Sequence, residues 1–379
     1  MRLATIAAIT SGDMGTSGGL GTLLMGSPAL EVAILLETGA ALPLSGLARI
    51  SGWPVSAGIA QLSLAELLAA DPELASIRQA FGDAAAGAVD SVALAPGSFR
   101  FAAPIPRPGK AIGVGFNYAD HLREQGRTGG DRPVLFSMFA NAVIGDGEPI
   151  RRPTGTHALD LEAELAVVIR RRASRVGLDE ALACVAGYTC ANDVTARDWQ
   201  GQKQALGPDE KGDGQWLRAK GSDTFLPMGP VLVTADELGD GKGLRIRSWV
   251  TPTIAPAAGA GDAAPPAGAH GDPASAAAEP GHESDEPLAM QDGNTDDLIF
   301  DVPAIVSMIS REVTLEPGDV ISMGTPSGVG VFRDPPTFLV PGDLVRIEVE
   351  RIGSLTNPVT DEDGQAPEGS PAARFLATR

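Results

Sequence analysis

Three carboxylates are the side chains of this sequence best placed to bind a metal ion. Glu162 and Glu164 lie two residues apart in the apolar segment LDLEAELAVVI, and Asp193 follows in ANDVTARDWQ. In an extended strand alternate side chains share a face, so the two glutamates lie side by side, followed by Ala166 and Val168. Burying unpaired like charges is costly, and a hard divalent cation such as Mg²⁺ would remove that cost. The alternative is an edge strand with two solvated glutamates.

A histidine beside a carboxylate could supply acid–base chemistry. His121 and Glu124 are three residues apart in NYADHLREQG, so on a helix they share one face and come into contact. The carboxylate would raise the basicity of the imidazole and orient its ring, which is what a general base needs. The spacing alone favours the simpler alternative, an ordinary surface His–Glu pair.

Two glycines close to this histidine resemble a cofactor-binding pattern. Gly113 and Gly115 could begin a Gly-x-Gly-x-x-Gly fingerprint, but Tyr118 stands where the third glycine is needed. No matching acid follows a second strand either. We therefore reject a dinucleotide-binding site here.

Further polar residues have the spacing of binding groups. Arg197 and Gln200 follow Asp193 at helical intervals, which would place all three on one face; the alternative is a first helical turn with an i, i+4 ion pair. Lys220 is expected in a loop before an apolar turn, where a lysine on its own is usually solvated. Thr325 lies in the Gly-rich loop GTPSGVG, whose backbone N–H groups could hold a carboxylate.

These residues need strands and helices to position them. We expect a strand over Leu159–Ile169 with a second, apolar face. A helix and an apolar strand over Leu178–Cys190 would bring Asp193 to the end of that strand, where functional groups are often held. An apolar strand over Ala111–Gly115 would lead into the helix that carries the histidine.

The rest of the chain alternates between apolar runs and turns. We expect a first strand within Met1–Thr10 and a helix over Ser63–Phe81, in which Ser63 and Glu66 form a capping box. A further helix is expected near Val302–Ser310. A Pro-Gly-Asp turn occurs before two of the late strands, which predicts a sheet of similar hairpins.

Composition and charge exclude several classes of function. The 379 residues are 43% hydrophobic and carry a net charge of −19, which argues against nucleic acid or an anionic membrane as partner but allows a small anionic substrate. Cys184 and Cys190 form no Cys-x-x-Cys pattern, and a reducing, cytoplasmic compartment is the simplest interpretation. No apolar run reaches the length of a membrane span.

Changes in composition divide the chain. We expect a small N-terminal accessory domain over residues 1–103, a catalytic domain over 104–362, and a flexible tail over 363–379. The catalytic domain is interrupted at about 251–290 by a segment rich in Ala, Gly, Pro and acids, which we expect to be a disordered insertion at the tip of a hairpin. His270 and His282 within it are expected to be incidental.

Taken together, these motifs resemble the fumarylacetoacetate hydrolase family. The matching stretches, in the family's order over roughly residues 104–360, are GFNYADHLREQG, LDLEAELAVVI, AGYTCANDVTARDWQ, KGSDTFLPMGP, QDGNTDDLIFDV, LEPGDVISMGTPSGVG and PGDLVRIEVERIGSLTNPV. The resemblance implies an α+β, β-rich fold, with a mixed β-sandwich or β-roll catalytic domain behind a small N-terminal domain. It also implies a homodimer.

The resemblance assigns roles to the polar residues by motif position. It implies a Mg²⁺ or Mn²⁺ ion held by Glu162, Glu164 and Asp193. It makes His121 and Glu124 the water-activating pair.

The remaining assignments concern the substrate. The resemblance makes Lys220 the residue that supports developing charge, and it matches Arg197, Gln200 and Thr325 to substrate-contacting positions. One departure is Val114, because true fumarylacetoacetases bring a further carboxylate to the metal there. The chain therefore looks more like the acylpyruvate and fumarylpyruvate hydrolases and the 2-hydroxyhepta-2,4-diene-1,7-dioate isomerases. The insertion is the second departure.

The expected reaction is metal-dependent hydrolysis of a C–C bond in a 2,4-dioxo acid, giving pyruvate and a carboxylic acid. His121 would take a proton from the attacking water, and Lys220 and the metal would stabilise the pyruvate enolate. Decarboxylation of an oxaloacetate-like acid, or isomerisation of a hydroxydienoic diacid as in aromatic catabolism, would use the same enolate and stays open. A non-enzymatic metal- and acid-binding protein is disfavoured, because every expected catalytic residue is present.

Overall fold

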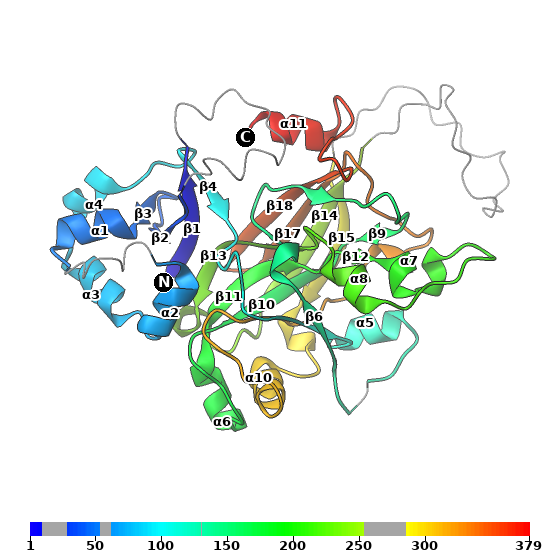
Figure 1. The fold of residues 1–379 in the computed structure, drawn as a ribbon, viewed down its shortest axis with the longest axis horizontal. Helices are drawn as coiled ribbons and strands as arrows, with labels where there is room; N and C mark the ends of the chain where they lie inside the picture. Colours follow the sequence, from blue (N-terminus) through cyan, green and yellow to red (C-terminus); the bar gives the residue numbers. More distant parts are fainter. Residues whose placement is uncertain (10–28, 54–61, 130, 254–285) are drawn as a thin grey trace.

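The fold was obtained as a computed structural model that describes residues 1–9, 29–53, 62–129, 131–253 and 286–379. It is an α+β, β-rich fold, as expected, and its sheets mix parallel and antiparallel pairs (Figure 1). The strands are β1 (Arg2–Ala8), β2 (Glu31–Leu35), β3 (Ala41–Pro43), β4 (Phe99–Ala102), β5 (Ala111–Gly115), β6 (Val134–Met138), β7 (Val143–Ile144), β8 (Ile150–Arg151), β9 (Leu159–Asp160), β10 (Ala163–Ile169), β11 (Val185–Asn192), β12 (Thr195–Ala196), β13 (Leu226–Thr234), β14 (Arg245–Thr251), β15 (Leu288–Asn294), β16 (Val320–Ser322), β17 (Leu344–Val349) and β18 (Gly353–Thr360).

Helices cover the ends and faces of these sheets. They are α1 (Leu44–Ser51), α2 (Leu64–Ala70), α3 (Ala75–Asp83), α4 (Ala86–Val92), α5 (Ala119–Glu124), α6 (Leu178–Ala181), α7 (Arg197–Gln200), α8 (Trp216–Gly221), α9 (Ala235–Leu238), α10 (Val302–Ser310) and α11 (Pro371–Ala377). In the described residues, no helix is long and apolar enough to cross a membrane.

Two sheets pack face to face around the main core. The larger sheet has the order β3-β2-β1-β13-β11-β10-β16-β5-β6, with β4 and β7 attached, and the smaller has the order β15-β14-β17-β18-β8. β10, β11 and β13 pack against β14, β17 and β18. Their facing side chains, among them Val167, Tyr188 and Ile347, are buried in one apolar cluster. This arrangement fits the expected β-sandwich.

The central strand β10 is apolar on both faces, as its sequence predicts. Leu165 and Val167 belong to the core between the two sheets. Ala166 and Val168 point the other way, into a second core that also contains residues of α1, α2 and α3. Because alternate side chains of a strand face opposite sides, the glutamate on the second face is held inside the protein, not at its surface.

The expected single strand over Leu159–Ile169 is two strands. β9 pairs with β12, β10 pairs with β11 and β16, and the two residues between them leave the ladder. At this break the backbone N–H of Glu162 donates to the Asn192 side chain. Glu162 therefore lies at the break, and only Glu164 of the two glutamates is in β10.

In the N-terminal part of the chain the expected first strand is present as β1, but the expected helix is split into α2 and α3. β1 pairs with β2, β4 and β13, so the boundary predicted at residue 103 falls within a continuous sheet. The capping box of Ser63 and Glu66 is present and begins α2. The expected helix over Ser63–Phe81 is interrupted before α3, because Pro72 has no backbone N–H to donate inside a helix. The division into two domains stays a prediction.

The hairpin and the C-terminal segment complete the fold. β14 and β15 form the expected antiparallel hairpin, and most of the predicted insertion, with His270 and His282, lies outside the described residues. The tail over residues 363–379 contains the helix α11, and its expected flexibility stays a prediction. Ser370 caps α11 by accepting from the Ala373 N–H, and Ala372 is buried and donates its own N–H to the loop before β17.

Candidate active site

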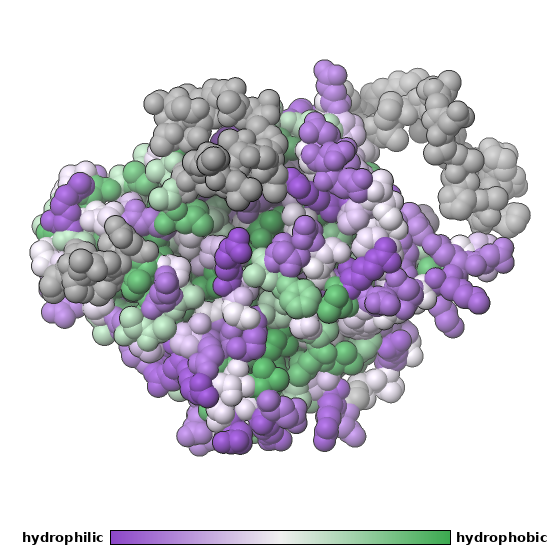
Figure 2. Space-filling view, viewed as in Figure 1, coloured by the Kyte–Doolittle hydropathy of each residue, from purple (hydrophilic) through white to green (hydrophobic). Residues whose placement is uncertain are grey.

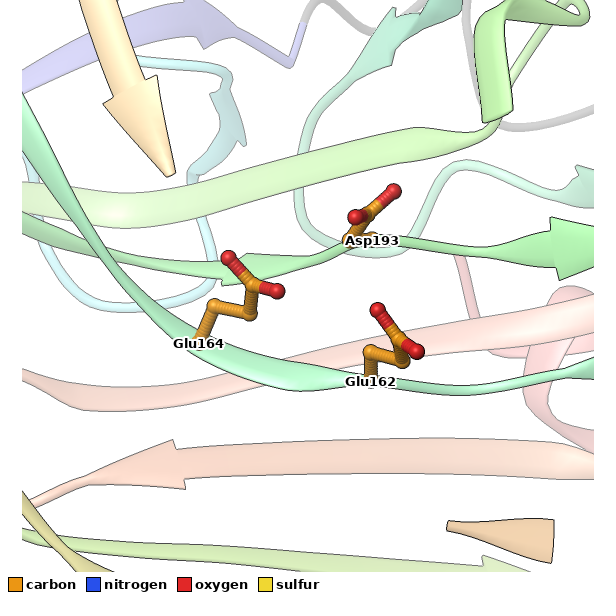
Figure 3. A group of neighbouring side chains, drawn as sticks. All are labelled: Glu162, Glu164 and Asp193. Atoms are coloured by element: carbon orange, nitrogen blue, oxygen red, sulfur yellow. The ribbon is translucent and has the colours of Figure 1, made fainter. Parts of the chain in front are cut away.

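The three predicted carboxylates meet in the structure. Glu162 precedes β10, Glu164 lies in it, and Asp193 directly follows the neighbouring strand β11. Each offers an oxygen, and these oxygens all lie within 4.8 Å of one another. Figure 3 shows the three side chains extending to the same side of the two neighbouring segments. All three are buried, which excludes the alternative of solvated glutamates on an edge strand.

Two cations also reach this group. Lys220 donates from Nζ to Glu162 at 2.8 Å, to Asp193 at 2.5 Å and to Thr195 at 2.9 Å. Arg197 Nη2 lies 2.7 Å from Glu162. We expected Lys220 in a loop. It lies instead on α8, where it is 2% exposed. An ammonium has three N–H donors, so all of those on Lys220 are used here.

Burial and these neighbours shift the acidities of the carboxylates in different directions. Burial favours the neutral form of Glu162, but Lys220 and Arg197 outweigh it and lower the pKa of Glu162 to about 2. Burial and the Glu162 charge raise the pKa of Asp193 to about 7, against the influence of Lys220. Burial, Asp193 and Glu162 raise the pKa of Glu164 well above its usual value. The raised pKa values of Glu164 and Asp193 show that Lys220 and Arg197 do not fully offset the burial and mutual repulsion of these two carboxylates.

The expected contact between His121 and Glu124 is formed. His121 lies in α5, and its Nδ1 is 2.9 Å from Oε2 of Glu124. His121 is buried, so this is not an ordinary surface pair. The ring also packs edge-on against Phe332, with centroids 5.8 Å apart. Both contacts fix the orientation of the imidazole.

The Gly-rich loop after β16 holds the protein's own carboxylates. We expected that its backbone N–H groups could hold a carboxylate. The carboxylates they hold are the protein's own: Gly324 donates to Glu164 at 2.8 Å, Gly328 donates to Glu124 at 2.9 Å, and Ser327 donates to Asp120 at 3.1 Å. Gly330 and Val331 both donate to Asp160. The loop thus positions Glu164 of the three clustered carboxylates and Glu124 beside His121.

Thr325, in the same loop, is close to the site but its hydroxyl is engaged. Its Oγ1 donates to the Ala163 carbonyl at 2.9 Å and accepts from Gln291 at 2.7 Å. Gln291 in turn accepts from the Ala163 N–H and from Ser248. A substrate could therefore use the Thr325 hydroxyl only as an acceptor unless one of these bonds breaks.

Arg197 and Gln200 lie on α7, but Asp193 does not share their helix. Asp193 comes before β12, so the expected common face of three residues is wrong. Arg197 donates from Nε to Asp160 at 2.8 Å and from Nη1 to Gln200 at 3.2 Å. The i, i+4 ion pair is replaced by pairs with Asp160 and Glu162.

One pocket collects most of these groups. Eight of the nine predicted site residues line it: His121, Glu162, Glu164, Asp193, Arg197, Gln200, Lys220 and Thr325. The ninth, Glu124, contacts His121 from outside the lining. Val114, the residue that departs from the pattern of true fumarylacetoacetases, lines it as well. From the segment that follows α7, Gln202 also reaches the lining.

The cluster formed by Glu162, Glu164 and Asp193 fits a divalent cation. Oδ1 of Asp193 is buried and has no hydrogen-bond partner in the described residues, which is costly unless something else satisfies it. The donors are all carboxylate oxygens, the ligands that Mg²⁺ and Mn²⁺ prefer. Glu162, Glu164 and Asp193 are the residues that would hold such an ion.

Several residues of the site were missed from the sequence. Asp160 precedes Glu162 by the same i, i+2 spacing by which Glu162 precedes Glu164, so the sequence pattern could have identified it. Gln291, Phe136 and Trp216 carry no such local signal, because each reaches the site only through the tertiary fold.

Comparison with known proteins agrees with these motifs. The sequence model for the C-terminal domain of fumarylacetoacetate (FAA) hydrolase matches residues 110–360. A curated relative, the mitochondrial oxaloacetate tautomerase fahd2 of Xenopus laevis, is 38% identical over 257 residues, which cover 68% of this chain and 67% of the relative.

Solved structures extend the comparison. The 5-carboxymethyl-2-hydroxymuconate delta-isomerase from Mycobacterium smegmatis has a TM-score of 0.53 and 34% identity, and the match covers 71% of this chain and 85% of that one. A fumarylacetoacetate hydrolase from Exiguobacterium antarcticum has a TM-score of 0.63 and 28% identity over 95% of this chain and 99% of its own. The second match therefore includes the N-terminal part of the chain.

Proposed function

Since this chain belongs to the fumarylacetoacetate hydrolase family, we propose that it is a divalent-metal-dependent enzyme that interconverts the keto and enol forms of a 2-oxo acid, with oxaloacetate as the reference substrate. This reverses the order expected from the sequence, where C–C hydrolysis came first. The change is supported by the curated relative, which is named an oxaloacetate tautomerase and is 38% identical to this chain.

The observation that carries the proposal is the single pocket shared by His121 and the three carboxylates. Tautomerisation needs a group that withdraws electrons from the 2-oxo carbon and a base beside C3. A divalent cation bound by Glu162, Glu164 and Asp193 would supply the first as a Lewis acid. His121 would supply the second.

The proton transfer can be written with the chain's own residues. Nδ1 of His121 is engaged with Glu124 at 2.9 Å, which leaves Nε2 to take the proton from C3 of the keto acid. The C–H electron pair forms the C2–C3 double bond, and the carbonyl pair moves onto the 2-oxygen. Return of the proton from His121 to that oxygen gives the enol, and the reverse sequence gives the keto form. Glu124 stabilises the imidazolium between the two transfers.

The buried cations would bind and orient the acid. Lys220 can turn an N–H toward the 2-oxygen only by giving up Glu162, Asp193 or Thr195. Arg197 is held by Asp160 and Gln200 beside the same pocket. Both would offset the negative charge of the substrate and of the developing enolate.

Hydrolysis of a C–C bond in a 2,4-dioxo acid is the second candidate. It is favoured by the fumarylacetoacetate hydrolase whose structure matches 95% of this chain. In that reaction His121 would take its proton from water, and the water oxygen would attack the 4-carbonyl. Cleavage of the C3–C4 bond would then leave pyruvate enolate and a carboxylic acid.

The two candidates are separated by a substrate panel with and without Mg²⁺ or Mn²⁺. The panel holds oxaloacetate, acetylpyruvate and fumarylpyruvate, with the enol band followed by absorbance and products identified by NMR. We expect metal-dependent acceleration of the keto–enol change of oxaloacetate with no loss of carbon. Release of pyruvate and a carboxylic acid would favour the hydrolase, and carbon dioxide would favour a decarboxylase. No metal-dependent change in any member would contradict both proposals.

Three further expectations accompany the proposal. We propose Mg²⁺ or Mn²⁺ as the ion, because the donors are hard carboxylate oxygens. The homodimer and the cytoplasmic location stay predictions, the first from the family resemblance and the second from the two cysteines, which are both free.

A further inference from the structure

We propose that Phe136 and Trp216 form the wall that selects the far end of the substrate, and that this wall favours a 2-oxo acid with a planar, uncharged tail. The inference rests on the proposed function for the reacting end of the acid. It concerns the part of the molecule beyond C3, which neither the metal carboxylates nor His121 would contact.

Three aromatic rings line one side of the pocket. Phe136 comes from β6, Trp216 from α8, and Phe116 follows β5. The Phe136 and Trp216 rings pack edge-to-face with centroids 5.4 Å apart, and Trp216 meets Phe116 in the same way at 6.1 Å. All three rings are only half-buried. Aromatic faces left open in a pocket bind flat, apolar groups.

The wall begins beside the reacting end. Nζ of Lys220 lies 5.0 Å from the centroid of the Phe136 ring, within range of a cation–π contact. Trp216 is four residues before Lys220 on α8, so both side chains lie on one face of that helix. A tail that leaves the reacting centre past Lys220 would therefore meet Phe136 first and Trp216 next.

Glycines in β5 make room for these rings. Gly113 is the cross-strand partner of Phe136, and a Cβ at position 113 would overlap the Phe136 ring. A Cβ at Gly115 would lie 3.4 Å from Trp216. A strand glycine often marks a close approach of another group. Gly113 and Gly115, which resembled part of a dinucleotide-binding motif, thus allow the rings of Phe136 and Trp216 to lie against β5.

The charges of the pocket argue against a second carboxylate on the tail. The lysine and arginine that line it, Lys220 and Arg197, are both paired with acids of the site. Gln125 and Gln202, also in the lining, are neutral. Arg127 stacks over Phe116 at 4.8 Å but is exposed and outside the lining. A charged tail would lose hydration without gaining an unpaired cation.

The surroundings of the wall are also apolar. Val134 and Leu135 of β6 and Leu217 of α8 are exposed large hydrophobic residues. Figure 2 shows hydrophobic colour in the middle of this face, over the area where Figure 1 draws β6 and α8. A planar hydrocarbon tail would therefore leave water along most of its path from the surface to the reacting centre.

The test compares benzoylpyruvate, whose tail is a phenyl ring, with oxaloacetate, whose tail is a carboxylate. We expect the wild-type kcat/KM to be higher for benzoylpyruvate. Phe136→Leu and Trp216→Leu should each lower it about fivefold to tenfold, mainly through KM, since each removes an aromatic contact with the phenyl ring. The kcat/KM for oxaloacetate should change less than about twofold. Trp249→Leu, which removes a half-buried tryptophan on β14, is the matched control.

Other outcomes would overturn the proposal. Equal losses for both acids would assign the rings a structural role only. A loss for oxaloacetate alone in Arg127→Gln would indicate that the tail is a second carboxylate held by that arginine. If neither acid is converted, the proposed function fails. The wall is then tested by calorimetry, where benzoylpyruvate must still bind more weakly to Phe136→Leu than to wild type.

Discussion

The backbone N–H of Gly328 donates to Oε1 of Glu124 at 2.9 Å, and this bond ties the partner of His121 to the loop that follows β16. The same loop donates from Gly324 to the metal-site carboxylate Glu164 at 2.8 Å. One loop therefore contacts both the hydrogen-bond partner of His121 and one of the three clustered carboxylates.

Replacing Gly328 should disturb the base without removing a site side chain. Its φ is +101°, and a Cβ there would overlap the Met290 carbonyl, so Gly328→Ala forces the loop to move. We expect kcat to fall at least about tenfold, because a small misplacement of a catalytic group is costly. Calorimetric Mg²⁺ affinity should change less. The control is Gly97→Ala, which has φ +85° but open space around it; equal losses in both variants would contradict the loop's role.

Loss of the histidine should separate metal binding from turnover. His121→Gln removes the base but no metal ligand, so we expect Mg²⁺ affinity to persist while kcat falls by about 10²–10⁴, the usual contribution of general base catalysis. The matched control is His157→Gln, a half-exposed histidine that contacts Asp198 and Glu210. Near wild-type kcat in His121→Gln would remove His121 as the base.

Local patterns predicted the parts of the site that depend on spacing. The i, i+2 glutamates, the i, i+3 pair of His121 and Glu124, and the strand that ends before Asp193 are all in place. Each depends on the period of a strand or a helix, which the sequence carries directly. The family resemblance then added Lys220, which no spacing could have connected to the carboxylates.

Relations that exist only in the tertiary fold were missed or wrong. The loop N–H groups were expected to be able to hold a carboxylate, but the sequence could not show that they hold four of the protein's own carboxylates from other segments. The bridging position of Asp160, between Arg197 and the Gly-rich loop, depends on strands that are far apart in the sequence. Helix α11 was overlooked because it is short and follows a polar stretch containing Gly and Pro, and its stability comes from a Ser370 cap and from packing on β18.

Removal of one carboxylate should abolish stabilisation by the metal. Asp193→Asn keeps the side-chain shape but deprives a hard cation of a charged ligand. In the wild type, free Mg²⁺ at 100 times its Kd should add about 2.7 kcal/mol to the free energy of unfolding. We expect Asp193→Asn to show little of this gain and a much weaker calorimetric affinity. Asp343→Asn, a buried carboxylate outside the site, is the control; an unchanged affinity in Asp193→Asn would refute the ligand assignment.

The contact between the Phe136 ring and Gly113 can be measured as a coupling energy between substitutions at the two positions, taken from their free energies of unfolding. Gly113→Ala should destabilise the protein by about 1–3 kcal/mol, because the added methyl group overlaps the ring and cores tolerate overpacking poorly. Phe136→Ala should remove that overlap. The double variant should therefore lose less free energy of unfolding in urea than the sum of the two single variants. Strict additivity would show that the ring does not lie against Gly113.

Shortening the hairpin should leave the fold and the site intact. Val250 of β14 pairs with Leu288 of β15, so the two strands are already adjacent where the acidic, Ala/Gly/Pro-rich segment leaves the sheet. A two-residue Asn-Gly turn is the usual connection for such a pair. We expect replacement of residues 255–285 by a short turn of this kind to keep the melting temperature within a few degrees. Mg²⁺ affinity and kcat should be unchanged as well, because the predicted site residues lie outside the deleted range. An unfolded product would show that the segment contributes to the fold, whereas a folded product with altered kcat would show that it acts on the pocket.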